Sequence, residues 1–312
     1  MGIVSDFEQR VQAVRLRLYQ EEELDALLLL LQEIDDLLTE RPTKDAYDLK
    51  VQAYRSLRGA TSDNADIGYD LILQKLLPWL IGPDGPDDAD YARGSARTIF
   101  TTWLAQYPED ARQGVLQAVL ETLGAALHSQ PTAQLCWTIS GLGYRQTALV
   151  DGLWELVHRD TDEIGDVALR ALAQLGIQEP GRRQLLDELH KRFALRRTLP
   201  LIGALTTLAD ITTVRVAESY LNQPPAENES PVLRILVLGI LAHIADAHDD
   251  MSDLQEEIWN MMVRLYEAAP ERYTSDIYLN GSIASQCDTS SVPTYLIKWL
   301  EQHPEDTEQA LN

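Results

Sequence analysis

Apolar residues recur three or four positions apart along most of this 312-residue chain, and the alternation typical of a half-buried β-strand is hard to find. At 3.6 residues per turn, side chains with that spacing lie on one face of an α-helix. The pattern therefore predicts an all-α protein. Three such stripes are Leu24, Leu27, Leu28, Leu31, Ile34 and Leu38; Val115, Val119, Leu123 and Leu127; and Leu185, Leu186, Leu189 and Phe193.

Proline and glycine divide the chain into short helical segments. Proline suits the first turn of a helix and breaks its interior, so most prolines are expected at helix starts or in connections. The predicted helices are mostly about 10–17 residues long, and helices of that length need neighbours to be stable. The dividing residues include Pro42, Pro83, Pro86, Pro108, Pro131, Pro180, Pro200, Pro224, Pro225, Pro231, Pro270 and Pro293.

Four predicted helices align with one another as an internal repeat. Each carries apolar residues at positions i, i+4 and i+7, followed by a small residue where the chain is expected to turn. Successive groups begin 33, 33 and 36 positions apart, and a further helix is predicted before each, at 112–127, 146–158, 181–194 and 212–222. The groups are Leu135-Ile139-Leu142-Gly143, Ala168-Leu172-Leu175-Gly176, Leu201-Leu205-Leu208-Ala209 and Val237-Leu241-Ile244-Ala245.

The segment from Asp160 to Gly176 resembles the second helix of a HEAT repeat. In that family an Asp-containing turn leads into a helix whose apolar positions match Ile164, Ala168, Leu172 and Leu175. HEAT repeats often carry Arg directly after the first apolar position. This segment departs from the family there, with Gly165, whereas the later unit has Arg234 after Leu233.

The resemblance implies a right-handed α-solenoid of about six to seven HEAT-like helical pairs, forming a single domain over residues 1–312. The match is best over 111–246, and the flanking segments 1–110 and 250–312 are expected to form irregular units. A non-repeat all-α bundle is the alternative. Architecture of this kind says little about chemistry by itself.

The charge of the chain narrows the class of partner. The net charge is −23, with 49 acidic residues against 26 basic ones. Affinity for nucleic acid comes largely from Lys and Arg that neutralise phosphates, so nucleic-acid binding is disfavoured. Acidity favours solubility, a basic partner or electrostatic steering. We expect a protein partner; the oligomeric state is left open.

No segment has the properties of a membrane anchor or a secretory signal. The longest apolar run, Leu27 to Leu31, is too short to cross a bilayer, and the first six residues have neither a basic start nor an apolar core. Cys136 and Cys287 lie in apolar or small-residue surroundings and are expected to be buried, reduced thiols. A cytoplasmic location follows.

The sequence contains no recognisable catalytic motif. Serine-hydrolase, P-loop, zinc-protease and dinucleotide fingerprints do not occur. HEAT-like DNA glycosylases pair a Trp with an Asp one helical turn away, and no Trp here has an acidic residue at i+4. A HEAT-like lyase or glycosylase is the less favoured alternative to a non-enzymatic role. No cofactor is expected.

Two charged clusters offer further candidate sites. His243 and His248 stand with acidic residues between 246 and 253, but they lack the i, i+4 spacing of a zinc helix, so no metal is expected. A basic stretch could dock an anionic ligand or nucleic acid, or could be paired internally with acidic side chains. It comprises Arg182, Arg183, His190, Lys191, Arg192, Arg196 and Arg197.

The repeat register also predicts where a partner would bind. In a HEAT-like stack the second helices line the concave side, and the row beside the apolar stripe there is the most polar. Gly141, Gly203 and Gly239 align in this row, which suggests close approach by a neighbouring helix or by a bound chain. The predicted binding residues are Trp137, Tyr144, Arg170, Gln174 and His243. We therefore expect a protein-binding scaffold or adaptor.

Overall fold

The structure is a computed structural model that describes residues 6–248, except 63, 84, 161–162 and 224–230, together with Ile258 and Met261. Every regular element in this described part is a helix, which confirms the all-α prediction. The chain divides after Leu175 into two compact units, and each is described by itself. The prediction of one domain over 1–312 stays a prediction.

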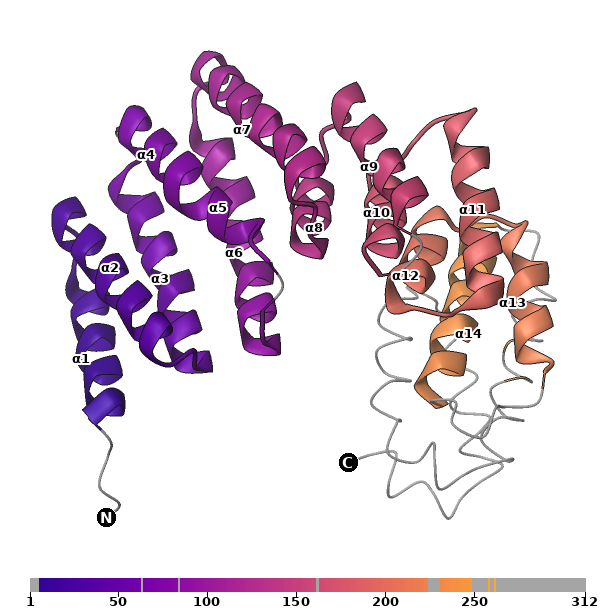
Figure 1. The fold of residues 1–312 in the computed structure, drawn as a ribbon, viewed down its shortest axis with the longest axis horizontal. Helices are drawn as coiled ribbons and strands as arrows, with labels where there is room; N and C mark the ends of the chain where they lie inside the picture. The colour runs from indigo at the N-terminus through magenta and orange to yellow at the C-terminus, as the bar shows by residue number, and fades with distance from the viewer. Residues whose placement is uncertain are drawn as a thin grey trace. The chain divides into compact units, whose positions relative to one another are not determined.

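In the first unit each helix packs against helices close to it in sequence (Figure 1). From α6 onward alternate helices contact one another: α6 contacts α8, α8 contacts α10, and α7 contacts α9. The helices are α1 (Asp6–Gln20), α2 (Leu24–Glu40), α3 (Lys44–Ala60), α4 (Ala65–Leu71), the π-helix η1 (Ile72–Leu76), α5 (Leu77–Leu80), α6 (Asp87–Gln106), α7 (Glu109–Ser129), α8 (Ala133–Leu142), α9 (Thr147–Arg159) and α10 (Glu163–Gln174).

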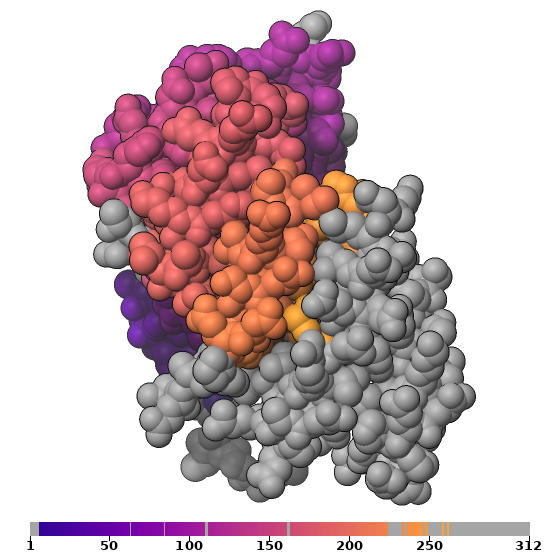
Figure 2. All heavy atoms as spheres, turned by 90° about the vertical axis from the view of Figure 1, so that its right-hand side faces the viewer, coloured from indigo at the N-terminus to yellow at the C-terminus, as the bar shows by residue number. Residues whose placement is uncertain are grey.

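The second unit packs by the same rule. Its helices are α11 (Gly181–Leu195), α12 (Leu199–Leu208), α13 (Thr213–Leu221) and α14 (Pro231–Ala247). α11 contacts α12 and α13, while α14 contacts α12 and α13. Figure 2 shows the salmon atoms of α11 and the orange atoms of α13 as one continuous surface. In both units the helices therefore pack mainly on helices that are near them in the sequence.

The helices expected in the aligned stretch are all present. The four predicted first helices correspond to α7, α9, α11 and α13, and the four second helices to α8, α10, α12 and α14. Pro86, Pro108 and Pro180 directly precede helices, as expected. Pro78 is an exception because it lies inside a continuous helical run from 65 to 80. The π turn just before it is a known way for a helix to accommodate an irregularity.

The predicted stripes form much of the core. All four members of the α7 stripe and all four of the α11 stripe are buried, and Cys136 is a buried thiol. In α2 the buried face is centred one position away from the prediction, because Leu30 and Leu37 are buried whereas Leu28 and Leu38 are half-buried. Cys287 lies outside the described residues.

Three of the predicted second helices end in the same way. Gly143, Gly176 and Ala209 follow α8, α10 and α12, and all three have left-handed backbone with φ of 69°, 65° and 44°. These positions are 33 residues apart, as the alignment predicts. The fourth expected turn was wrong: Ala245 lies inside α14, which continues to Ala247. α14 is therefore longer than the second helices before it.

Replacing Ala209 with Gly should stabilise the protein by about 0.5–1 kcal/mol. An L-residue in the left-handed region is strained by about 1–2 kcal/mol, and glycine removes that strain but makes the unfolded chain more flexible. Urea unfolding followed by circular dichroism measures the change. Gly143→Ala is the matched control and should destabilise by a similar amount, since a methyl group there meets no atom within 4 Å. A change in the free energy of unfolding with the same sign in both variants would contradict the prediction.

Candidate functional site

Trp137 on α8 and Arg170 on α10 form a cation–π pair. The Arg170 guanidinium carbon lies 4.6 Å from the centroid of the indole ring, and both side chains are partly exposed. Their equivalent positions in the 33-residue register bring them onto the same face of neighbouring second helices. Such a contact stabilises by about 0.5–1 kcal/mol when exposed and more when desolvated. The predicted row requires Trp137 and Arg170 to lie on the same face, and their contact shows that they do.

Arg170 is held by this ring without a carboxylate partner. No described residue forms an ion pair with it, and its Nε atom is buried with no hydrogen-bond acceptor. Burial lowers the pKa of Arg170, because desolvation disfavours the charged form. Among the described residues, the site therefore holds a cation that forms no ion pair.

Tyr144 and Gln174 lie close to this pair in sequence and are exposed. Tyr144 follows the left-handed Gly143 and is 41% exposed. The next residue, Arg145, donates a hydrogen bond from Nε to the carbonyl of Leu175, so the turn after α8 is tied to the end of α10. Gln174 is the last residue of α10. The four predicted binding residues of the first unit thus come from α8, α10 and the turns at their ends.

The aligned glycines have a different explanation from the one expected first. A Cβ atom built at Gly141 or Gly239 would meet no atom within 4 Å. Close approach by a neighbouring helix is therefore the wrong explanation at these two positions. Gly141 is exposed between Trp137 and the end of α8, where its missing side chain leaves the helix backbone accessible.

Arg97 on α6 also contacts α8, and sequence reasoning missed it. Its Nη2 donates to Oε1 of Gln134, and its Nε donates to Oγ1 of Thr138 at 3.4 Å. Burial and the nearby positive charge of Arg93, opposed by the negative charge of Asp90, lower the pKa of Arg97 to about 10. Both acceptors are neutral, so Arg97 resembles Arg170 in having no ion pair among the described residues.

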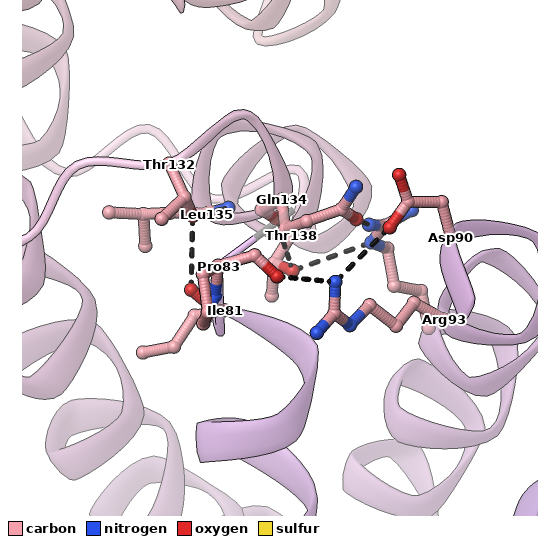
Figure 3. Close-up of polar contacts among 9 residues, drawn as sticks. Ile81, Pro83, Asp90, Arg93, Thr132, Gln134, Leu135 and Thr138 are labelled. Carbon is pink, nitrogen blue, oxygen red and sulfur yellow. Dashed lines mark hydrogen bonds and ion pairs between the residues drawn. The ribbon is translucent and has the colours of Figure 1, made fainter. Parts of the chain in front are cut away.

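The loop between α5 and α6 is tied to both α6 and α8 (Figure 3). Nη1 of Arg93 donates to the carbonyl of Pro83 at 2.8 Å and to Oδ1 of Asp90 at 3.1 Å. Thr132 donates from Oγ1 to the carbonyl of Ile81 at 3.0 Å and also accepts from the amide at the start of α8. These bonds join the α5–α6 loop to α6 on one side and to the beginning of α8 on the other.

The sequence holds only a weak signal for Arg97. Arg93 and Arg97 are four positions apart, so they are neighbours on one helix face, after an acidic first turn. That pattern predicts solvent-facing or internally paired charges equally well. The contact with Gln134 spans 37 positions, and it depends on how α6 and α8 pack.

Most of the predicted basic stretch in the second unit has internal partners. Arg182 pairs with Asp210 at 2.9 Å, and Glu188 pairs with both Lys191 at 3.2 Å and Arg192 at 2.9 Å. Arg192 is buried. The pKa of Glu188 is lowered: burial opposes the shift, but hydrogen bonds and charge from its two basic partners outweigh it.

The other members of this stretch differ from one another in their contacts and exposure. Arg197 stacks over the ring of Tyr220 at 4.7 Å, and Arg183 is exposed on α11. His190 lies 2.9 Å from the hydroxyl of Thr213, and burial lowers its pKa against the opposing charges of Asp210 and Asp187. Arg196 is half-buried in the turn after α11. Internal pairing, one of the two interpretations of this stretch, accounts for much of its charge.

His243 is half-buried on α14, in the second unit. His248 lies 3.3 Å from the carbonyl of Ala209, whereas the acidic residues from 249 to 253 fall outside the described residues. In the part of the chain that the structure covers, no group of His, Cys, Asp and Glu is arranged to hold a metal ion. Likewise, none of the helices described has the length and apolar character needed to cross a membrane.

Comparison with known proteins gives no match: no family model, no curated protein and no solved structure matches this chain. The HEAT resemblance therefore rests on the residues between Asp160 and Gly176 and on the 33-residue register.

Proposed function

We propose that the protein is a cytoplasmic, HEAT-like, right-handed α-solenoid that acts as a scaffold without catalysis. It binds a protein partner on the surface of its second helices. The residues that carry the binding are Trp137, Tyr144 and Arg170, with Gln174 beside them. The observation that carries the proposal is the contact between Trp137 and Arg170, 33 residues apart and on adjacent second helices.

The architecture is supported by packing and by helix ends. Contacts between alternate helices are what two stacked layers require, and both units have such contacts: α6 with α8, α8 with α10 and α7 with α9 in the first, and α11 with α13 and α12 with α14 in the second. Left-handed residues at 143, 176 and 209 repeat at the period of the alignment. A non-repeat bundle has no reason to end three successive second helices at one period.

The binding role is supported by the residue types that are exposed. Trp, Tyr and Arg dominate interface hot spots because each combines a large apolar area with a polar group. Here they stand together, partly exposed, beside a glycine that leaves α8 accessible. By contrast, the basic stretch at 182–197, the alternative site for an anionic ligand or nucleic acid, has Arg182, Lys191 and Arg192 already paired with carboxylates.

The double variant Trp137→Ala/Arg170→Ala should lose its partner. Proteins that co-purify with the full chain from its native host are quantified by mass spectrometry for wild type and variant. We expect specific partners to fall at least about tenfold, since hot-spot truncations typically cost about 2 kcal/mol or more. A thermal melt accompanies each sample, because loss of the cation–π contact lowers stability by about 0.5–2 kcal/mol.

Trp154→Ala/Arg159→Ala is the matched control. It removes the same two residue types from α9, the first helix of the pair, where Trp154 stacks on His158. This control should retain the partners. Retention of the same partners by the Trp137/Arg170 variant, or equal losses in both variants, would overturn the assignment of the binding surface.

A further inference from the structure

The surface on which we build this inference, called the α8 surface, consists of Arg97, Trp137, Gly141 and Arg170. Arg97 contacts α8 from α6, and Arg170 contacts it from α10. Trp137 and Gly141 lie four positions apart on α8 and therefore share a face. All four residues are at least partly exposed.

The two arginines differ from two buried cations of the first unit, which are paired with carboxylates. Lys50 pairs with Asp35 at 2.6 Å, and Arg93 pairs with Asp90 at 3.1 Å. Arg97 instead bonds to a neutral amide and a neutral hydroxyl, and Arg170 lies over an indole ring. The chain carries 49 acidic side chains against 26 Lys and Arg, yet no described carboxylate forms an ion pair with either arginine, although the charge of Asp90 acts on Arg97 from further away.

Both arginines therefore keep unused capacity for an anion. A guanidinium presents five N–H donors in a planar fork that matches a carboxylate. Partial burial makes such a bond stronger than at a fully exposed site, because water competes less for it. The indole holds Arg170 in place, which reduces the conformational entropy lost when a ligand binds.

We propose that the α8 surface binds an acidic peptide segment of a partner protein, with one carboxylate at Arg97 and another at Arg170. This rests on the proposed scaffold function and specifies the partner. The two arginines reach α8 from two different neighbouring helices, α6 and α10, and a helix with its side chains is about 10–12 Å across. An extended chain rises about 3.3 Å per residue, so the two carboxylates would be about three or four residues apart. The peptide backbone crosses α8 at Gly141, where no side chain obstructs it.

A peptide fits this surface better than a polyanion does. The net charge of −23 repels any anion, but the repulsion grows with the ligand's charge. Duplex DNA carries a charge about every 1.7 Å, whereas the peptide needs only two. At physiological salt the long-range repulsion is screened beyond about 8 Å, while contacts at the partly buried arginines are screened less.

The test is a selection of random 12-residue peptides displayed on phage against the immobilised full chain. We expect enriched peptides to carry two acidic residues three or four positions apart. The best synthetic peptide should bind Arg97→Gln and Arg170→Gln at least about tenfold more weakly than wild type, because each variant loses one charge-assisted pair. Arg170→Lys, which keeps the charge without the planar fork, should lie between. Thermal melts verify that each variant is folded.

Arg159→Gln is the charge control, since Arg159 is exposed on α9. It should bind the peptide as wild type does. Enriched peptides without acidic residues, or equal affinity for wild type and the arginine variants, would overturn the acidic-peptide proposal and leave the scaffold standing. No enrichment over bare support also overturns it, while the co-purification experiment decides the scaffold separately. Binding of a labelled single-stranded oligonucleotide that depends on Arg97 and Arg170 would reassign the surface to nucleic acid.

Discussion

Alanine at Gly68 should destabilise the protein by about 1–3 kcal/mol, whereas alanine at Gly94 should stabilise it by about 0.5–1 kcal/mol. A Cβ at Gly68 would collide with the Tyr107 hydroxyl and lie 3.2 Å from both Thr61 Oγ1 and Trp103 Nε1. A Cβ at Gly94, in the middle of α6, meets no atom within 4 Å. The same substitution therefore has opposite signs at the two sites.

The reason lies in how α4 meets α6. Trp103 and Tyr107 are buried, and Tyr107 is fixed at the end of α6, so the ring cannot swing aside cheaply. Burial also raises the pKa of Tyr107 to about 12, as expected for a hydroxyl held away from water. An added methyl group must then push the helices apart or force an unfavourable rotamer.

Urea unfolding of the two single variants measures both effects. Tyr107→Phe combined with Gly68→Ala is the diagnostic double variant, because it removes the closest contacting atom. It should recover part of the stability that Gly68→Ala loses, which appears as a coupling energy in the double-mutant cycle. Equal effects of alanine at Gly68 and Gly94 would show that α4 and α6 do not approach as closely as described.

The helices and their ends were predictable because their causes are local. The stripe of α7 and the stop at Gly143 follow from helical spacing and from the freedom of glycine to adopt positive φ. The Trp137–Arg170 contact was predictable for a related reason: once the 33-residue register is fixed, equivalent positions on adjacent second helices are neighbours. The length of α14 was not, because Ala245 does not force the helix to end.

Contacts between non-equivalent positions could not be predicted from the sequence. The pairing of Glu188 with Arg192 is an i, i+4 contact within one helix, but that of Arg182 with Asp210 spans 28 positions and two helix ends. Arg97 similarly finds its acceptors on α8 only because α6 and α8 pack side by side. A one-residue change in helix rotation would bring other residues together.

The repeat itself can be tested by removing exactly one period. Deleting residues 144–176 removes 33 residues, α9 and α10, and joins Gly143 to Ile177. The new junction, Leu-Gly-Ile-Gln, is identical to the native sequence from Leu175 to Gln178. In the shortened chain α11 therefore follows α8 through the same connection that joins it to α10 in the full chain.

Deleting residues 144–160 removes only α9 and its following turn. A second helix then leads directly into another second helix, so α10 must either reverse its direction or leave its layer. The apolar faces of α7 and α10 lose the neighbour that covers them, and both are exposed to water. This shorter deletion should do more damage than the longer one, although it removes about half as many residues.

The most direct measurement of the repeat is the thermal melt of these two deletions, followed by circular dichroism at 222 nm. The account predicts that the 33-residue deletion gives a folded helical protein with a cooperative melt at a somewhat lower temperature. It predicts that the 17-residue deletion loses the cooperative transition or aggregates. A 17-residue deletion that melts as cooperatively as the 33-residue deletion would contradict a chain built from repeating helical pairs.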